Sequence, residues 1–79
     1  MQRIDKGTFK RILILEESDF TKPNLLKGER CELVCIPISR ILDDKLLLEI
    51  LPVISVDGVF FGNIMYYNSL EEIDKFIKL

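Results

Sequence analysis

The sequence predicts a single α/β domain over residues 1–79, built on a four-stranded mixed sheet. Three observations lead to this fold class. Short apolar runs rich in Ile, Leu and Val alternate with polar, helix-capping stretches. An Asp-Gly pair separates two strand-like runs, and the last ten residues carry apolar side chains at helical spacing. The predicted order is strand, short helix, strand, helix, hairpin and helix, or β-α-β-α-β-β-α.

The first predicted strand covers residues 9–15 and ends in the apolar run Ile-Leu-Ile-Leu. A continuous apolar run is typical of a strand that is buried on both faces, as in a parallel sheet. The following stretch, residues 16–30, carries capping residues, Pro23 and the stop signal Gly28. It predicts one or two helical turns or an irregular loop, so the first helix is short or irregular.

The second strand is predicted at residues 31–39. Pro37 cannot donate to a ladder, so we expect it at the end of this strand or on an edge. Ser39 is predicted to cap a helix over residues 40–50, which Pro52 then ends. The apolar stripe of this helix comprises Leu42, Leu46 and Ile50, with Leu47 beside it.

Residues 53–56 and 59–62 flank Asp57-Gly58, which predicts an antiparallel hairpin with a type I′ turn. Residues 63–68 are predicted as a loop. Ser69 and Glu72 form a capping box for the final helix. Its expected buried face is Leu70, Ile73, Phe76 and Ile77. The first two strands should be parallel, joined by a right-handed crossover.

Composition excludes several classes of function. The chain has no His, which removes the usual general base and the commonest zinc ligand. Its net charge of −2 comes from mixed acids and bases, so no nucleic-acid partner is expected. No apolar stretch approaches the roughly 20 residues of a membrane span, and the N-terminus lacks a signal-peptide h-region. We therefore expect a cytoplasmic protein without a membrane partner.

One segment carries a family resemblance. Residues 51–62, Leu-Pro-Val-Ile-Ser-Val-Asp-Gly-Val-Phe-Phe-Gly, resemble the glutaredoxin pattern V-P-x-x-F-I-D-G-x-x-I-G-G. The resemblance covers about the last half of the chain and implies a thioredoxin-like fold, an α+β sandwich, with Pro52 in the cis form. It also implies a ligand-binding groove, for glutathione or another peptide, beside Pro52. The groove residues would be Ser18, Asp19, Leu51, Pro52, Gly62 and Asn63.

The catalytic feature of that family, Cys-x-x-Cys after the first strand, is absent. Residues 16–20 occupy this place with Glu-Glu-Ser-Asp-Phe, and the two Glu carboxylates would oppose a thiolate. The family's Gly-Gly pair is reduced to Gly62-Asn63. These departures favour a non-catalytic domain that needs no cofactor.

Cys31, Cys35 and Ser18 are the only candidates for a reactive residue. In a strand, the two cysteines lie about 13 Å apart, too far for a disulfide, so we expect free, structural thiols with a redox or metal role as the alternative. Ser18 could replace a nucleophile, but no base is available and either Ser18 or Asp19 could cap a helix. Glu16, Glu17 and Asp19 could bind a metal or form an acid–base pair, but a solvated loop is favoured and no metal site is predicted.

These patterns leave three hypotheses open. The first is a non-catalytic interaction module that binds a protein partner or forms a homodimer. It is supported by the short first helix, which should leave apolar sheet uncovered, and by the adjacent Tyr66 and Tyr67, one of which should be exposed. The second is a thiol-disulfide oxidoreductase that uses Cys31 or Cys35. The third is the small-ligand site beside Pro52.

Overall fold

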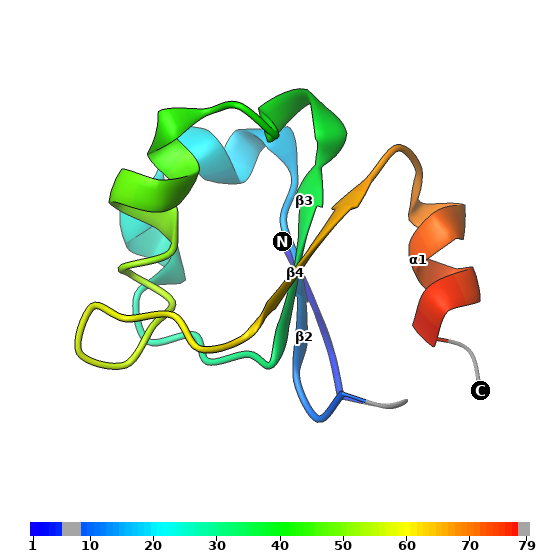
Figure 1. Cartoon of the computed structure of the whole chain (residues 1–79), viewed down its shortest axis with the longest axis horizontal. Helices are drawn as coiled ribbons and strands as arrows, with labels where there is room; N and C mark the ends of the chain where they lie inside the picture. Colours follow the sequence, from blue (N-terminus) through cyan, green and yellow to red (C-terminus); the bar gives the residue numbers. More distant parts are fainter. Residues whose placement is uncertain (6–8, 78–79) are drawn as a thin grey trace.

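The computed structural model describes residues 1–5 and 9–77 (Figure 1). It is a mixed α/β structure with a four-stranded mixed sheet and a C-terminal helix. The elements in chain order are the strands β1 (Gln2–Ile4) and β2 (Ile12–Ile14), the short helical turns η1 (Glu17–Thr21) and η2 (Pro23–Leu26), β3 (Leu33–Pro37), η3 (Ile38–Arg40), η4 (Leu46–Ile50), β4 (Asn63–Tyr67) and α1 (Leu70–Ile77).

The sheet has the order β1-β2-β3-β4. β1 is antiparallel to β2, whereas β2, β3 and β4 are parallel. Leu13 pairs with Val34, and Val34 with Ile64, which sets the register across the three parallel strands. The predicted parallel pair at residues 9–15 and 31–39 is therefore confirmed, with Pro37 at the end of its strand as expected.

The sheet lies between two helical layers (Figure 1). Alternate residues of β2 and β3 point to opposite faces, which is why both strands are apolar throughout. One face packs against the short helical turns, and its core is Leu13, Leu15, Val34 and Ile36 with Phe20, Leu26, Leu46, Ile50 and Ile54. The other face packs against α1, and its core is Ile12, Ile14, Leu33, Cys35 and Tyr67 with Ile73 and Ile77.

The prediction of a C-terminal β-hairpin is only partly correct. Asp57 and Gly58 both have positive φ, 53° and 78°, as a type I′ turn requires, but the ladder is a single Val56–Val59 bridge. The residues before this bridge form helical turns instead of a strand, because the N–H of Ile54 donates a hydrogen bond to the carbonyl oxygen of Ile50. The fourth strand is instead β4, which was predicted as a loop, and the antiparallel strand of the sheet is β1. All five residues of β4 pair with β3, whereas the hairpin at residues 53–62 forms only the one Val56–Val59 bridge.

The predicted helix over residues 40–50 is broken into η3 and η4. It ends at Ile50, as expected, and Leu46 and Ile50 are buried. Leu42 is 91% exposed and Leu47 65%, so the predicted stripe is wrong at both positions. Ser39 lies inside η3 and does not cap it.

The first crossover contains η1 and η2, which confirms the prediction of one or two helical turns. The expectation of uncovered sheet is wrong for β2 and β3, which are buried on both faces, with Phe20 and Leu26 each 1% exposed. On the outer strand β4, Ile64 is 40% exposed.

The final helix is confirmed as α1. Ile73 and Ile77 are buried, but Leu70 and Phe76 are half exposed, and the Phe76 ring stacks on Phe9 at 6.1 Å. In the part of the chain that the structure describes, no helix has the length and apolar character needed to cross a membrane.

Candidate functional site

One candidate site lies at the carboxyl ends of the parallel strands. The chain leaves β3 toward the layer of helical turns and leaves β4 toward α1, on the opposite face of the sheet. Adjacent strands whose connections diverge in this way open a crevice, which is where α/β sheets commonly bind ligands. A cavity of about 370 Å³ lies at these strand ends. We call it the carboxyl-edge crevice; it is lined by Glu16, Glu17, Pro37, Ile38, Ser39, Tyr67 and Asn68.

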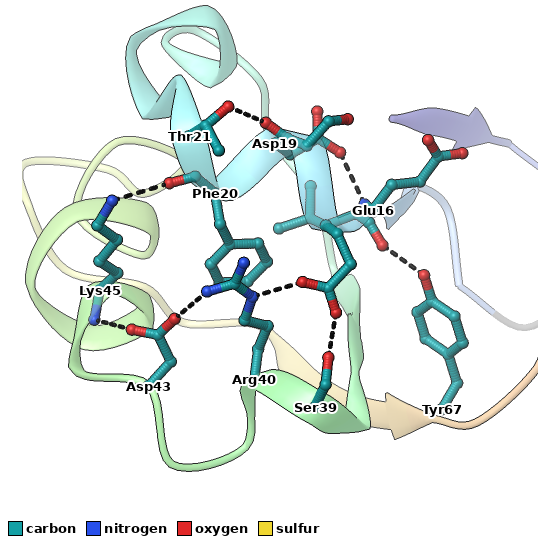
Figure 2. Close-up of polar contacts among 12 residues, drawn as sticks. Glu16, Asp19, Phe20, Thr21, Ser39, Arg40, Asp43, Lys45 and Tyr67 are labelled. Carbon is teal, nitrogen blue, oxygen red and sulfur yellow. Dashed lines mark hydrogen bonds and ion pairs between the residues drawn. The ribbon is translucent and has the colours of Figure 1, made fainter.

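Tyr67 closes the crevice on the β4 side. Its hydroxyl donates a 2.5 Å hydrogen bond to the carbonyl oxygen of Leu15, and its side chain is 8% exposed (Figure 2). Burial, and next the charge of Glu16, raise the pKa of the Tyr67 phenol. Tyr67 therefore stays protonated at neutral pH and links the ends of β4 and β2.

An ion-pair cluster closes the other side. The Glu17 carboxylate accepts hydrogen bonds from the Ser39 hydroxyl and, at 2.7 Å, from Nε of Arg40 (Figure 2). These two bonds lower the pKa of Glu17. Nη1 of Arg40 donates to Asp43 at 2.7 Å, and its guanidinium lies 4.9 Å from the ring centroid of Phe20. All the charged groups of the cluster are thus paired within the domain.

Asp19 and Ser18 lie next to this crevice, and Asp19 has a structural role. Its carboxylate accepts the backbone N–H of Glu16 at 2.7 Å and lies 3.3 Å from the amino group of Met1. Ser18 is exposed, and its carbonyl oxygen accepts the hydroxyl of Thr21. This arrangement matches the capping interpretation of Asp19 rather than a nucleophilic role for Ser18.

The groove implied by the glutaredoxin resemblance is not assembled. The Leu51–Pro52 bond is trans, as is every peptide bond among residues 1–5 and 9–77, so the expectation of a cis Pro52 is wrong. Gly62 and Asn63 lie at the amino end of β4, the opposite edge of the sheet from Ser18 and Asp19. The two ends of a five-residue strand are about 13 Å apart. The six residues therefore do not form one pocket.

Cys31 lines a separate cavity of about 300 Å³ at the amino edge of the sheet, with Phe60, Gly62 and Asn63 among its neighbours. Both cysteines are free thiols, as predicted, and Cys35 is fully buried in β3. Burial, and next the charge of Glu29, raise the pKa of Cys31 to about 11. Burial raises the pKa of Cys35 to about 11 as well. Neither sulfur is a thiolate at neutral pH, so neither is activated for disulfide exchange.

Two further possibilities are limited by the geometry. No group of three or more Cys, Asp and Glu side chains suited to a metal ion occurs within the described ranges. A polar cavity of about 290 Å³ beside β1 contains Arg3, Arg11 and Arg30. Arg3 is held by both carboxylate oxygens of Glu29, and Arg30 donates to the carbonyl oxygen of Ser55. Two of these three cations are therefore already bound by the domain itself.

Sequence reasoning missed Tyr67 and Ser39 as residues of the crevice, and Arg40 as the partner of Glu17 beside it. It also expected one of the two adjacent tyrosines to be exposed, whereas Tyr66 is half buried and Tyr67 is buried. They point to opposite faces of β4, where Tyr66 packs against the core beneath the helical turns and Tyr67 belongs to the core beneath α1. The signal that could have located the crevice was present, because Glu16 directly follows the first predicted strand and Ser39 ends the second, and these two strands were predicted to be parallel.

Comparisons of this chain with protein-family models, with curated proteins and with solved structures found no match.

Proposed function

We propose that this domain is a non-catalytic module that binds a protein partner through an apolar surface on the β3–β4 crossover. The observation that supports it most is the exposure of four aliphatic side chains within residues 41–48. Leu42 is 91% exposed, Leu48 75%, Leu47 65% and Ile41 47%. We call these four residues the apolar crossover surface. Single exposed leucines are common, but several large apolar side chains exposed on one short segment favour an interaction site.

The backbone of this segment is well anchored, which supports a preformed surface. Leu46 and Ile50, from the same turns, are buried in the core. The Lys45 ammonium donates to the carbonyl oxygen of Phe20 at 3.2 Å, and Asp43 pairs with Arg40 (Figure 2). Anchoring on both sides holds the four aliphatic side chains outward, and a preorganised surface loses less entropy on binding.

The protonation of the thiols and the hydrogen bonding of the crevice residues support a role other than catalysis. A disulfide exchange reaction needs an accessible thiolate, and both cysteines have raised pKa values. In the carboxyl-edge crevice, Tyr67 and Glu17 are hydrogen-bonded to other groups of the domain. An oxidoreductase that uses Cys31 is the alternative, since Cys31 lines a cavity.

The thioredoxin-like assignment is a separate proposal. It is supported by the parallel strand–crossover–strand unit, the Asp57-Gly58 turn and the final helix. The strand order and the trans Pro52 count against it, and the binding proposal does not depend on it. We place the module in the cytoplasm, because free thiols such as Cys31 and Cys35 are typical of reducing compartments.

Site-specific photo-crosslinking tests the binding proposal. The photoreactive residue benzoylphenylalanine would replace Leu42, and in a matched control it would replace the exposed Glu71 of α1. We expect the protein with the probe at position 42 to form a discrete adduct in the cells that produce it, and Leu48→Asp to abolish that adduct. Adducts of equal yield and identity at positions 42 and 71 would contradict the proposal.

A hydroxyethyl-disulfide assay tests the non-catalytic part. We expect no turnover above background for the wild type. Turnover that disappears in Cys31→Ser would establish the oxidoreductase alternative instead.

A further inference from the structure

β4 forms an open edge of the sheet. In the described part of the chain it pairs only with β3, and in Figure 1 no helix crosses it. The N–H of Asn63 donates to the carbonyl oxygen of Glu32 at 2.7 Å, which directs Asn63 toward β3. The backbone groups of successive strand residues point to alternate sides. Met65 and Tyr67 therefore also face β3, whereas the N–H and C=O groups of Ile64 and Tyr66 face the open edge.

This edge lacks the features that usually prevent strand pairing. Natural edge strands are commonly short, or carry Lys, Pro or a bulge. β1, at the other edge, has three residues and a charged Arg3 that pairs with Glu29. β4 has the sequence Asn-Ile-Met-Tyr-Tyr, without charge, Pro or Gly, and its Ile and two Tyr side chains have a high preference for strands.

We propose that β4 pairs antiparallel with β4 of a second copy of this chain, about a two-fold axis at Met65. The two outward-facing residues then lie opposite each other, Ile64 against Tyr66 of the second copy, and this pair occurs twice. A pair of outward-facing residues in an antiparallel ladder exchanges two hydrogen bonds. The contact therefore supplies four N–H to C=O bonds and joins the two sheets into one.

The choice of a second copy as the occupant follows from self-complementarity. A two-fold interface requires the same strand to fit itself, and β4 does so in register without placing like charges opposite each other. Ile64 is 40% exposed, and Tyr66 is half buried on the same face of the strand. Their pairing across the axis would cover an exposed aliphatic side chain with an aromatic ring.

The interface is small, because it consists mainly of one pair of five-residue strands. Contacts that bury less than about 1,200 Å² are characteristic of weak complexes, so we expect a Kd on the order of 100 µM. This inference adds a partner and a second surface to the proposed binding function, and it uses no residue of the apolar crossover surface. The two proposals can therefore fail independently.

Sedimentation velocity between about 10 µM and 1 mM protein tests the dimer. Ile64→Pro removes one edge-facing N–H without touching a hydrogen bond to β3, whereas the control Ile64→Val keeps that N–H and the β-branched side chain. We expect dimerisation of the wild type and of Ile64→Val, and at least a tenfold higher Kd for Ile64→Pro. A wild type that stays monomeric at 1 mM would overturn the inference, while the crosslinking test of the binding function would still stand.

Amide hydrogen exchange in the wild type provides a second measurement that needs no variant. We expect the amides of Ile64 and Tyr66 to become at least tenfold more protected as the dimer forms, with the Met65 amide protected at every concentration. A dimer that leaves Ile64 and Tyr66 unprotected, or one that is lost in Leu42→Asp instead, would place the interface elsewhere and overturn the inference.

Discussion

Replacing Tyr67 by Phe tests whether the carboxyl-edge crevice is held together by one buried hydrogen bond. Tyr67 is the last residue of β4, and Leu15 directly follows β2, so their 2.5 Å bond joins two strands that are not neighbours in the sheet. Leu15 is fully buried, and the Tyr67 side chain is 8% exposed. The variant keeps the ring and its packing against Ile73 and Ile77, but it leaves the Leu15 carbonyl without its donor.

The size of the effect follows from the burial of that carbonyl. Leaving a buried polar group without its partner costs about 1–3 kcal/mol, so we expect Tyr67→Phe to lower the free energy of unfolding by about 2 kcal/mol. For a domain of 60–100 residues, each kcal/mol corresponds to about 4–8 °C in Tm. Urea unfolding followed by circular dichroism should show a lower midpoint with an unchanged m value.

Tyr66→Phe is the matched control. Tyr66 lies next to Tyr67 in the same strand, and no hydrogen bond of its hydroxyl is seen within the described residues. We expect this variant to change the free energy of unfolding by less than about 0.5 kcal/mol. Equal losses in the two variants, or no loss in Tyr67→Phe, would refute the idea that the Tyr67–Leu15 bond stabilises this edge.

Two further predictions concern the thiols and the loop after β2. Cys31 and Cys35 have pKa values of about 11 in the folded state, above the value of about 8.5 for an unfolded thiol. The unfolded chain therefore loses these protons first, and stability to urea should fall as the pH rises from about 8 to about 11. Thiol labelling at pH 8 should also be at least tenfold slower than in urea, and equal rates would contradict the assigned burial. Asp19→Ala should lower the free energy of unfolding by about 0.5–2 kcal/mol, because the Glu16 N–H loses its acceptor. Ser18→Ala should change the free energy of unfolding by less than about 0.5 kcal/mol. A larger effect at Ser18 than at Asp19 in thermal unfolding would reverse the assigned roles.

The sequence predicted those parts of the fold in which local pattern and burial agree. The apolar run at residues 12–15 and the run at 33–36 predict strands covered on both faces, and both runs are buried in β2 and β3 or next to them. Asp57-Gly58 adopts the positive φ values that its residue types favour. The sequence of the final helix has a capping-box pattern, a charge gradient and an apolar face, and each of these predicts the same element.

The rest depended on contacts distant in sequence. β1 has only three residues with polar neighbours, and its antiparallel pairing with β2 has no local signal. Residues 53–62 and 63–67 have similar preferences for strands, so pattern alone could not decide which of them joins β3. Leu42 fits an apolar stripe by spacing, but the break between η3 and η4 turns it outward.

The position of the last strand also determines where a functional site can lie. With a hairpin at residues 53–62, Pro52, Gly62 and Asn63 would lie near the loop after β2, and the groove predicted from the glutaredoxin resemblance would form. With β4 at Asn63–Tyr67, Gly62 and Asn63 move to the amino edge of the sheet, and Tyr67 moves to the carboxyl edge. Placing the last strand a few residues later in the chain thus puts Gly62 and Asn63 at the end of the sheet opposite the loop after β2. It also makes β4, an uncharged segment that was predicted as a loop, the edge strand of the sheet. The proposed dimer therefore follows from the position of β4 and would not follow from the predicted hairpin.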